Sequence, residues 1–236
     1  MLDFNRSNLS ATPLSVAINE LIACAELPGP NLRHYLGASA IGSECLRKVQ
    51  FDWMVAPVHA SRTRDIFRRG HLFEGLTRQH LVRAGLVFAP EKQLGFSAAN
   101  GLFRGHADGI VTAGPVLPGV GYPCVWEHEA LSDKGWKNLE RDGLGKTYPQ
   151  YAAPISLYQA YPGIDDHPAT FTAVNANTME RLHLLHEFDA ERAQAWSDRA
   201  VMIIEATKAG ELLPRLTEDP SDWRCRMCSH KARCWG

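Results

Sequence analysis

The stretch Cys124-Val-Trp-Glu-His-Glu-Ala-Leu131 decides the fold, because it is apolar at both ends and long enough to form a core strand. Its two acidic residues, Glu127 and Glu129, are two positions apart, so on a strand both side chains project from the same face. Burying two carboxylates on one face is costly unless a cation holds them. The stretch therefore predicts a central strand that carries a metal site.

Two further acidic residues complete this predicted metal site. Asp108 stands among small residues in Arg104-Gly-His-Ala-Asp-Gly109, directly before another apolar strand, and Glu74 falls in a long helical pattern. Carboxylate oxygens are the ligands that Mg²⁺ and Mn²⁺ prefer. Each acid taken alone reads as a solvated surface residue, so the prediction rests on all four together.

The spacing of apolar residues predicts the other elements. Residues 1–12 form a tail, and a helix over 13–26 is stopped by Pro28-Gly29-Pro30. The other expected helices span about 43–54, 61–84, 133–141, 148–161 and 189–209, and the expected strands lie within 86–112 and at 124–131, 169–175 and 180–187. We expect one α/β domain with a mostly antiparallel meander, divided into 1–42 (tail and helix), 43–210 (core) and 211–236 (cysteine-rich segment).

The composition is that of a globular protein, with 236 residues, 45% hydrophobic residues and a formal net charge of -1. No apolar run reaches the ~18 residues that cross a bilayer, and residues 1–10 lack an apolar signal core. We therefore expect a cytoplasmic protein with no membrane partner. The balanced charge argues against a histone-like nucleic-acid binder but allows a local basic groove.

The cysteines form the second chemical pattern. In a reducing compartment, six cysteines are read first as metal ligands. Three of them lie within ten residues, at Cys225, Cys228 and Cys234, which leaves a four-coordinate metal or a four-iron cluster one ligand short. Cys45, in a polar setting near a helix start, is the expected fourth ligand, with His230 as the alternative. Cys24 and Cys124 sit in apolar patterns and are expected to be buried thiols.

From about Ser43 to Gly236, the chain resembles the PD-(D/E)XK nuclease superfamily. Within it, the chain is similar to the RecB-like iron–sulfur nucleases of the AddB and CRISPR-adaptation type and their phage relatives. The motifs that carry the resemblance are Gly70-His-Leu-Phe-Glu74, Gly105-His-Ala-Asp108-Gly, Glu127-His-Glu129 at the family's E-x-K position, Ser132-Asp-Lys134-Gly-Trp-Lys137, and Tyr148-Pro-Gln-Tyr151-Ala-Ala-Pro154-Ile-Ser-Leu-Tyr158. The one-plus-three arrangement of cysteines is the most specific of the matches.

The resemblance implies a restriction-endonuclease-like core, in which a mixed central sheet is flanked by helices. It implies a [4Fe-4S] cluster on the four cysteines, and one or two Mg²⁺ or Mn²⁺ ions on Glu74, Asp108, Glu127 and the main-chain carbonyl of His128. The implied activity is exonucleolytic cleavage of DNA ends or single strands, in recombination or phage DNA processing, inside a prokaryotic cell or a phage-infected host and with protein partners in recombination.

Two positions depart from the family pattern. Glu129 stands where the family has a lysine, and a carboxylate cannot supply positive charge to the phosphate. It could instead act as a general base, as in members of the superfamily that carry E-x-E. Pro154 stands where a glutamine is expected and removes a backbone donor, unless the helix starts there.

The candidate DNA contacts are basic and aromatic. The arginines at 62, 64, 68 and 69, with Lys134 and Lys137, are candidate phosphate contacts, and Tyr151 and Tyr158 are candidate stacking partners for a base. The arginines could equally solvate a helix face, and the tyrosines could belong to the core. Three function classes follow: a metal-dependent deoxyribonuclease, an inactive nuclease fold that binds DNA or regulates, and a zinc-stabilised protein-interaction domain.

Overall fold

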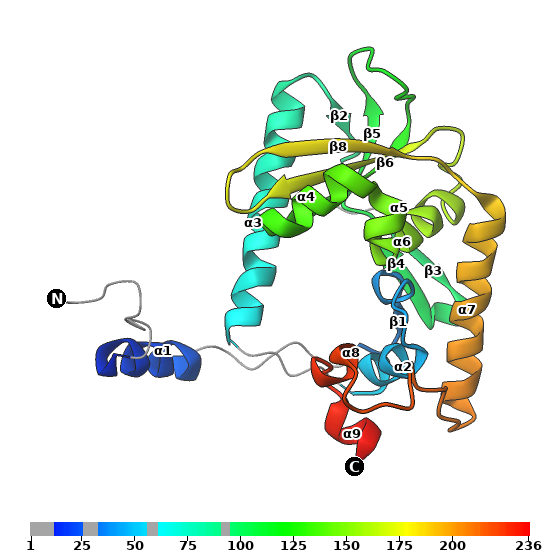
Figure 1. Cartoon of the computed structure of the whole chain (residues 1–236). Coiled ribbons are helices and arrows are strands. Elements are labelled where there is room, and N and C mark those ends of the chain that lie inside the picture. Colours follow the sequence, from blue (N-terminus) through cyan, green and yellow to red (C-terminus); the bar gives the residue numbers. More distant parts are fainter. Residues whose placement is uncertain (1–11, 26–32, 56–60, 91–94) are drawn as a thin grey trace.

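The computed structural model describes residues 12–25, 33–55, 61–90 and 95–236, so the expected tail at 1–11 lies outside the described residues. Figure 1 shows α3 on one side of the molecule and α7 on the other, with the larger sheet between them. The helices longer than five residues are α1 (Pro13–Ala25), α2 (Leu46–Met54), α3 (Ser61–Arg83), α4 (Asp133–Asp142), α6 (Pro149–Ala160) and α7 (Ala190–Lys208). The short helices are α5 (Leu144–Thr147), α8 (Trp223–Arg226) and α9 (Lys231–Trp235).

The larger sheet has five strands in the order β2-β5-β6-β7-β8. They span Val87–Phe88 (β2), Gly109–Ala113 (β5), Cys124–Leu131 (β6), Ala169–Asn175 (β7) and Arg181–His186 (β8). The central strand β6 pairs in parallel with β7, with Glu127 opposite Phe171, and the other pairs are antiparallel. The parallel pair needs a long crossover, which α4, α5 and α6 supply.

A second sheet corrects the expected meander over 86–112. Strands β1 (Leu36–Gly37), β4 (Phe103–His106) and β3 (Gly95–Ala98) form a separate three-stranded sheet in the order β1-β4-β3. The chain leaves this sheet after β4 and enters the larger one at β5, so the two residues between them, Ala107 and Asp108, lie where the sheets meet. The expectation that the strands within 86–112 form one continuous meander was wrong, because strand partners are set by contacts remote in sequence.

Helix α6 forms much of the core. Its residues 152–159 are all buried, and it packs against α7, β4 and β6. Pro154 lies inside this helix, which begins at Pro149. The helix therefore does not start at Pro154, and the proline removes a backbone donor from its interior. The helix retains its shape there because apolar neighbours such as Ile155 and Leu157 are fully enclosed.

Helix α2 holds the C-terminal segment to the core. The Arg47 Nε atom donates to the carbonyl of Leu213 at 2.6 Å. The buried side chain of Gln50 donates to Thr207 Oγ1 at 3.2 Å and to the Glu211 carbonyl at 2.7 Å, and accepts from the Leu213 N–H at 3.0 Å. Residues near the two ends of the core are thus joined directly.

Helix α1 spans the predicted residues but buries none of them. Cys24 is exposed on it, so the expectation of a buried thiol was wrong there, whereas Cys124 is buried as expected. The apolar pattern alone could not show whether this helix has a packing surface within the chain. Among the helices that the structure describes, none is both long and apolar enough to span a membrane.

Candidate active site

Backbone N–H groups hold the carboxylates of Asp108 and Glu127 in place where the two sheets meet. The Glu127 Oε1 atom accepts the backbone N–H of Asp108 at 3.0 Å, and the Asp108 Oδ2 atom accepts the backbone N–H of His128 at 2.9 Å. This reciprocal pair fixes one oxygen of each carboxylate. Among the described residues, the other oxygen of each accepts no hydrogen bond and is open to a ligand.

The pKa values of three carboxyls are raised at this point. Burial, then the charge of Glu74, raises the pKa of Asp108 to about 7. Burial, then the charges of Asp108 and Glu74, raises the pKa of Glu129 to about 8. The pKa of Glu127 is raised well above its ordinary value by burial and by the charges of the other three acids. The four predicted acids therefore lie close enough to repel one another.

Glu74 reaches the site from α3. Its side chain is 24% exposed and lies 3.5 Å from His71. One helical turn further on, Arg78 donates to the Asp108 carbonyl at 3.5 Å and to the Ala89 carbonyl at 3.3 Å. Arg78 thus ties α3 to the start of β5. Arg78 was not among the predicted site residues, although its position four residues after Glu74 puts both side chains on one face of the helix.

The donor set suits a hard divalent cation. These carboxylates are half-buried, and burial together with mutual repulsion raises their pKa values. Such groups are stabilised most by a bound positive charge. As the side chains stand, no three His, Cys, Asp or Glu residues in the described part of the chain lie in metal-binding geometry. The residues present fit a divalent cation chemically, and small side-chain movements would be needed to bind it.

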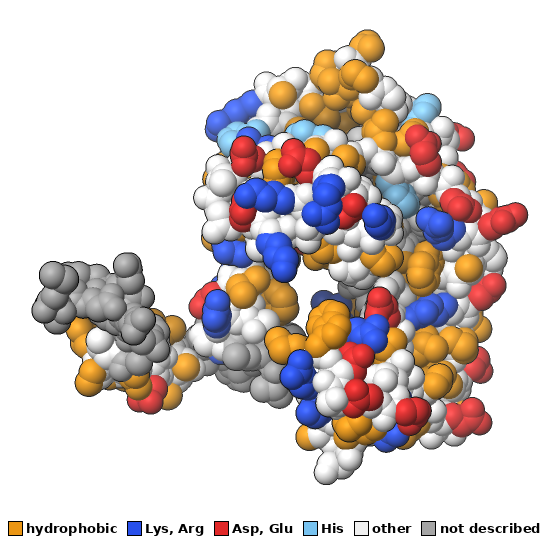
Figure 2. All heavy atoms as spheres, viewed as in Figure 1, with side chains coloured by type: hydrophobic (Ala, Val, Ile, Leu, Met, Phe, Trp, Pro, Cys, Tyr) orange, Lys and Arg blue, Asp and Glu red, His pale blue; other side chains and the backbone are white. Residues whose placement is uncertain are grey.

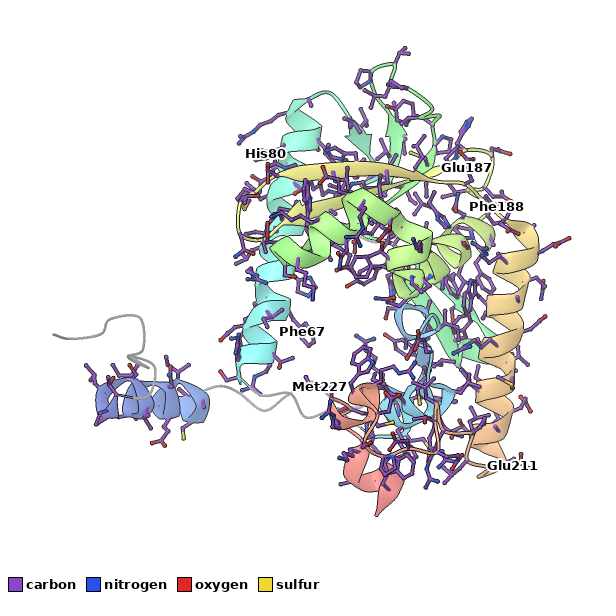
Figure 3. All side chains as sticks on the ribbon, in the orientation of Figure 1. Phe67, His80, Glu187, Phe188, Glu211 and Met227 are labelled. Carbon is purple, nitrogen blue, oxygen red and sulfur yellow. The ribbon has the colours of Figure 1, made fainter. Side chains whose placement is uncertain are left out.

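His128 faces away from these carboxylates, because it alternates with Glu127 and Glu129 along β6. Burial, with the charges of Arg181 and His183, lowers the pKa of its imidazole to about 4. Its predicted contribution is the main-chain carbonyl, and that remains a prediction. On the same side of the sheet, Arg181 lies 2.8 Å from His80 of α3, which Figure 3 labels beside β8.

The tyrosines of α6 lie at different depths. Tyr158 is only 5% exposed, and the charges of Glu127 and Asp108 help to raise its pKa. Tyr151 is half-buried and packs on Phe171. Tyr148, at the N-cap of α6, lies 5.2 Å from Tyr151 between ring centroids. The charge of Glu129 helps to raise the pKa of both Tyr148 and Tyr151. Tyr148 was not among the predicted contacts.

The predicted basic contacts are exposed, except for Arg64, which is half-buried. Lys134 and Lys137 lie on the outer face of α4, where Lys137 pairs with Asp133 at 2.9 Å. Arg68 and Arg69 lie on α3, where Arg68 pairs with Asp65 at 3.1 Å. Figure 2 shows the surface hollowed between α4 and the C-terminal segment, with Lys and Arg side chains on both sides. In Figure 3, Phe67 of α3 and Met227 of the C-terminal segment lie on facing sides of this opening.

The four predicted cysteine ligands lie together. All four line one cavity of about 580 Å³, and burial, then the charges of Asp222 and of the other three cysteines, raises the pKa of the Cys225 thiol. They do not stand in metal-binding geometry in the described part of the chain. His230, the alternative ligand, bonds to Asp52 Oδ1 at 2.7 Å through its Nε2 atom. Cys45 occupies the N-cap of α2, near the predicted helix start.

Comparison with known proteins relates this fold to a nuclease. No family model matches the chain, and no curated protein matches its sequence. The crystal structure of an alkaline exonuclease (LHK-Exo) from Laribacter hongkongensis matches with a TM-score of 0.53 and 14% identity, covering 75% of this chain and 89% of that chain. The same protein in complex with dAMP gives the same values. The structure of SSO0001 matches with a TM-score of 0.48 and 11% identity over 94% of each chain.

At this level of identity the match shows the fold, not the activity. The mixed α/β architecture with helices flanking mixed sheets, predicted from the sequence, is confirmed. The chain therefore has the fold of the alkaline exonuclease.

Proposed function

We propose that the chain is a divalent-metal-dependent deoxyribonuclease. The observation that carries the proposal is the convergence of Glu74, Asp108, Glu127 and Glu129 at the meeting point of two sheets. The fold shared with an alkaline exonuclease agrees with it, and so do the basic side chains around the hollow beside α4. DNA ends or single strands are the proposed substrates.

Each residue of the site has its own proposed role in DNA cleavage. Glu74, Asp108, Glu127 and the His128 carbonyl would hold one or two Mg²⁺ or Mn²⁺ ions, which lower the pKa of a bound water and neutralise phosphate charge. The backbone N–H groups of Asp108 and His128 keep two of these carboxylates in place. Glu129 is then placed to accept a proton from the attacking water, because its half-buried side chain projects from the same face of β6 as Glu127. Lys134 and Lys137 would contact phosphates.

The test is a nuclease assay on labelled single-stranded, linear duplex and circular DNA, with Mg²⁺ and with Mn²⁺. We expect cleavage of the linear substrates only, and complete loss of cleavage in EDTA. The matched control is Asp108→Asn, which keeps an oxygen for the His128 N–H but removes the charge. Cleavage that survives in Asp108→Asn would place the active site elsewhere.

A second candidate is a DNA-binding protein on an inactive nuclease fold. The observation that favours it is Glu129 itself, since a carboxylate stands where the related nucleases carry a lysine. Under this alternative the chain binds DNA but does not cleave it with any divalent cation. The same assay, combined with a binding measurement in EDTA, separates the two.

We also propose that Cys45, Cys225, Cys228 and Cys234 hold a [4Fe-4S] cluster. The support is that these residues, far apart in sequence, line one cavity. Zinc bound to the same thiolates is the alternative and corresponds to a protein-interaction domain. Anaerobically purified protein should contain about four irons and four sulfides per chain. One zinc without sulfide would exclude the cluster.

A further inference from the structure

Three aromatic rings lead from the core to the edge of the carboxylate site. Phe171 is 1% exposed at the core end. Tyr151 stacks on it, with ring centroids 6.3 Å apart and planes 24° apart, and Tyr148 follows at 5.2 Å and 40°. Both tyrosines are half-buried, so the outer end of the series remains open. A further flat ring could continue the stack.

The rings lie beside the reacting groups. Tyr151 packs on Phe171, which is paired with Glu127 between the parallel strands β6 and β7, so the ring lies on the carboxylate side of the sheet. Tyr148 is held there by α4, because a Cβ on Gly135 would lie 2.5 Å from the Tyr148 hydroxyl. Only glycine at position 135 lets the hydroxyl approach the first turn of α4 so closely. The ring pair is thus already in position before any ligand arrives.

The residues that flank Tyr148 and Tyr151 in the sequence face away from the carboxylate site. Lys146, Thr147, Pro149 and Gln150 line the 580 Å³ cavity. The same cavity is lined by the basic residues Arg47, Lys48, Arg215, Arg224 and Lys231. The basic side chains of this cavity therefore belong to another side of the chain than the rings, whereas the rings lie beside the carboxylates. Aromatic rings next to a carboxylate site match the needs of a nucleic-acid strand whose bases are unpaired.

Resting on the proposed function, we propose that Tyr148 and Tyr151 stack on an unpaired base next to the scissile phosphate, so that the chain selects DNA with single-stranded ends. A paired base is already stacked within its duplex and does not offer a free face to the rings. Stacking of one base on an aromatic side chain contributes about 1–3 kcal/mol. This corresponds to a ~5- to ~150-fold effect on affinity.

The experiment measures binding without cleavage, in the Asp108→Asn protein with EDTA. Fluorescence anisotropy gives the Kd of a labelled oligothymidylate and of the same strand with abasic sites. Tyr148→Ala should weaken binding of the normal strand ~5- to ~150-fold, whereas Tyr148→Phe should bind as before. The abasic strand should bind Tyr148→Ala and its parent equally, because no base is left to stack.

The matched control is Tyr161→Ala. Tyr161 caps the other end of α6 and stacks on Phe96 at 4.1 Å, so it is an equally aromatic contact on the same helix. It should leave the Kd for DNA unchanged. Urea unfolding and near-ultraviolet circular dichroism confirm that each variant is folded. A variant that fails this check is replaced by Tyr148→Leu, which keeps bulk without the ring face.

The outcomes distinguish this proposal from the nuclease assignment. Equal losses on the normal and abasic strands, or equal losses in Tyr148→Ala and Tyr148→Phe, would overturn the stacking role. So would equal affinity of the parent protein for blunt duplex and single strand. The natural chain could cleave no DNA while Tyr148→Ala still loses affinity for the normal strand but not for the abasic strand. That result would support the stacking site and contradict the proposed nuclease activity.

Discussion

Glu129 decides between an enzyme and a binding protein. If it accepts the proton of the attacking water, Glu129→Ala should lower metal-dependent cleavage by roughly 10² or more. Glu129→Lys should then cleave no better than the natural chain. Initial rates on labelled linear DNA check both. Cleavage gained only in Glu129→Lys would identify the natural chain as the inactive fold, because the lysine would restore positive charge at the phosphate.

Asp108 should destabilise the metal-free protein at alkaline pH. Its pKa of about 7 lies above the ordinary value of 3.8, so ionisation is easier in the unfolded chain, and stability is lost as pH rises through this range. In EDTA at about pH 8, Asp108→Asn should therefore raise the Tm by at least ~2 °C. Addition of Mn²⁺ should raise the Tm of the natural chain and leave that of Asp108→Asn unchanged. Thermal unfolding followed by circular dichroism measures all four values.

His186 should make the fold sensitive to acid. Burial, then the charge of Arg192, lowers its pKa below the ordinary 6.5, and its Nε2 atom lies 3.0 Å from Ser156 Oγ. Below pH 6.5 the unfolded chain takes up the proton first, so this contribution to stability is present above 6.5 and lost as pH falls. Urea unfolding at several pH values should show a smaller acid loss in His186→Gln than in the natural chain. Parallel curves would contradict this role.

At the scale of single residues, the sequence predicted the acids better than their surroundings. Alternation along a strand was enough to place Glu127 and Glu129 on one face. Tyr148 could not be predicted, because its place depends on where α6 begins and on the absence of a side chain at Gly135. Gln50 could not be predicted either, since its partners lie more than 150 residues away and no local pattern marks them.

At the scale of elements, Gly105 allows β4 and α6 to pack closely. A Cβ at this position would lie 2.6 Å from Tyr158 Cε1 and 2.7 Å from Ala38 Cβ. Gly105→Ala should therefore lower the free energy of unfolding by about 1–3 kcal/mol through overpacking. The matched control is Gly75→Ala in α3, where the new Cβ would meet nothing within 4 Å. It should raise the free energy of unfolding by about 0.5–1 kcal/mol, and urea denaturation measures both.

The elements themselves were predictable where they are long or fully apolar. The bounds of β6 and β7 equal the predicted 124–131 and 169–175, because both strands are long and carry mostly buried residues. The pattern between 86 and 112 located short strands but not their partners. Helix α2 begins at Leu46 instead of 43 because Cys45 takes the extended conformation of an N-cap.

At the scale of the whole molecule, Gln50 secures the C-terminal segment. Its amide makes three hydrogen bonds to residues 207–213 while 1% exposed. Gln50→Leu would leave the buried Leu213 N–H without its partner, at a cost of about 1–3 kcal/mol, and would also remove the hydrogen bond to the Glu211 carbonyl. We expect limited proteolysis to cut the variant within 207–236 faster than the natural chain. Gln79→Leu, at an exposed position on α3, is the control and should be cut at the natural rate.

The bond between Gln50 and Leu213 spans 163 residues. During synthesis, α2 therefore emerges from the ribosome long before the segment that satisfies its buried amide exists. At the ~5–20 residues per second typical of translation, this wait lasts on the order of ten seconds or more. Throughout that interval the face of α2 that will be buried is open to chaperones, and a truncated product ending before residue 207 would never cover it.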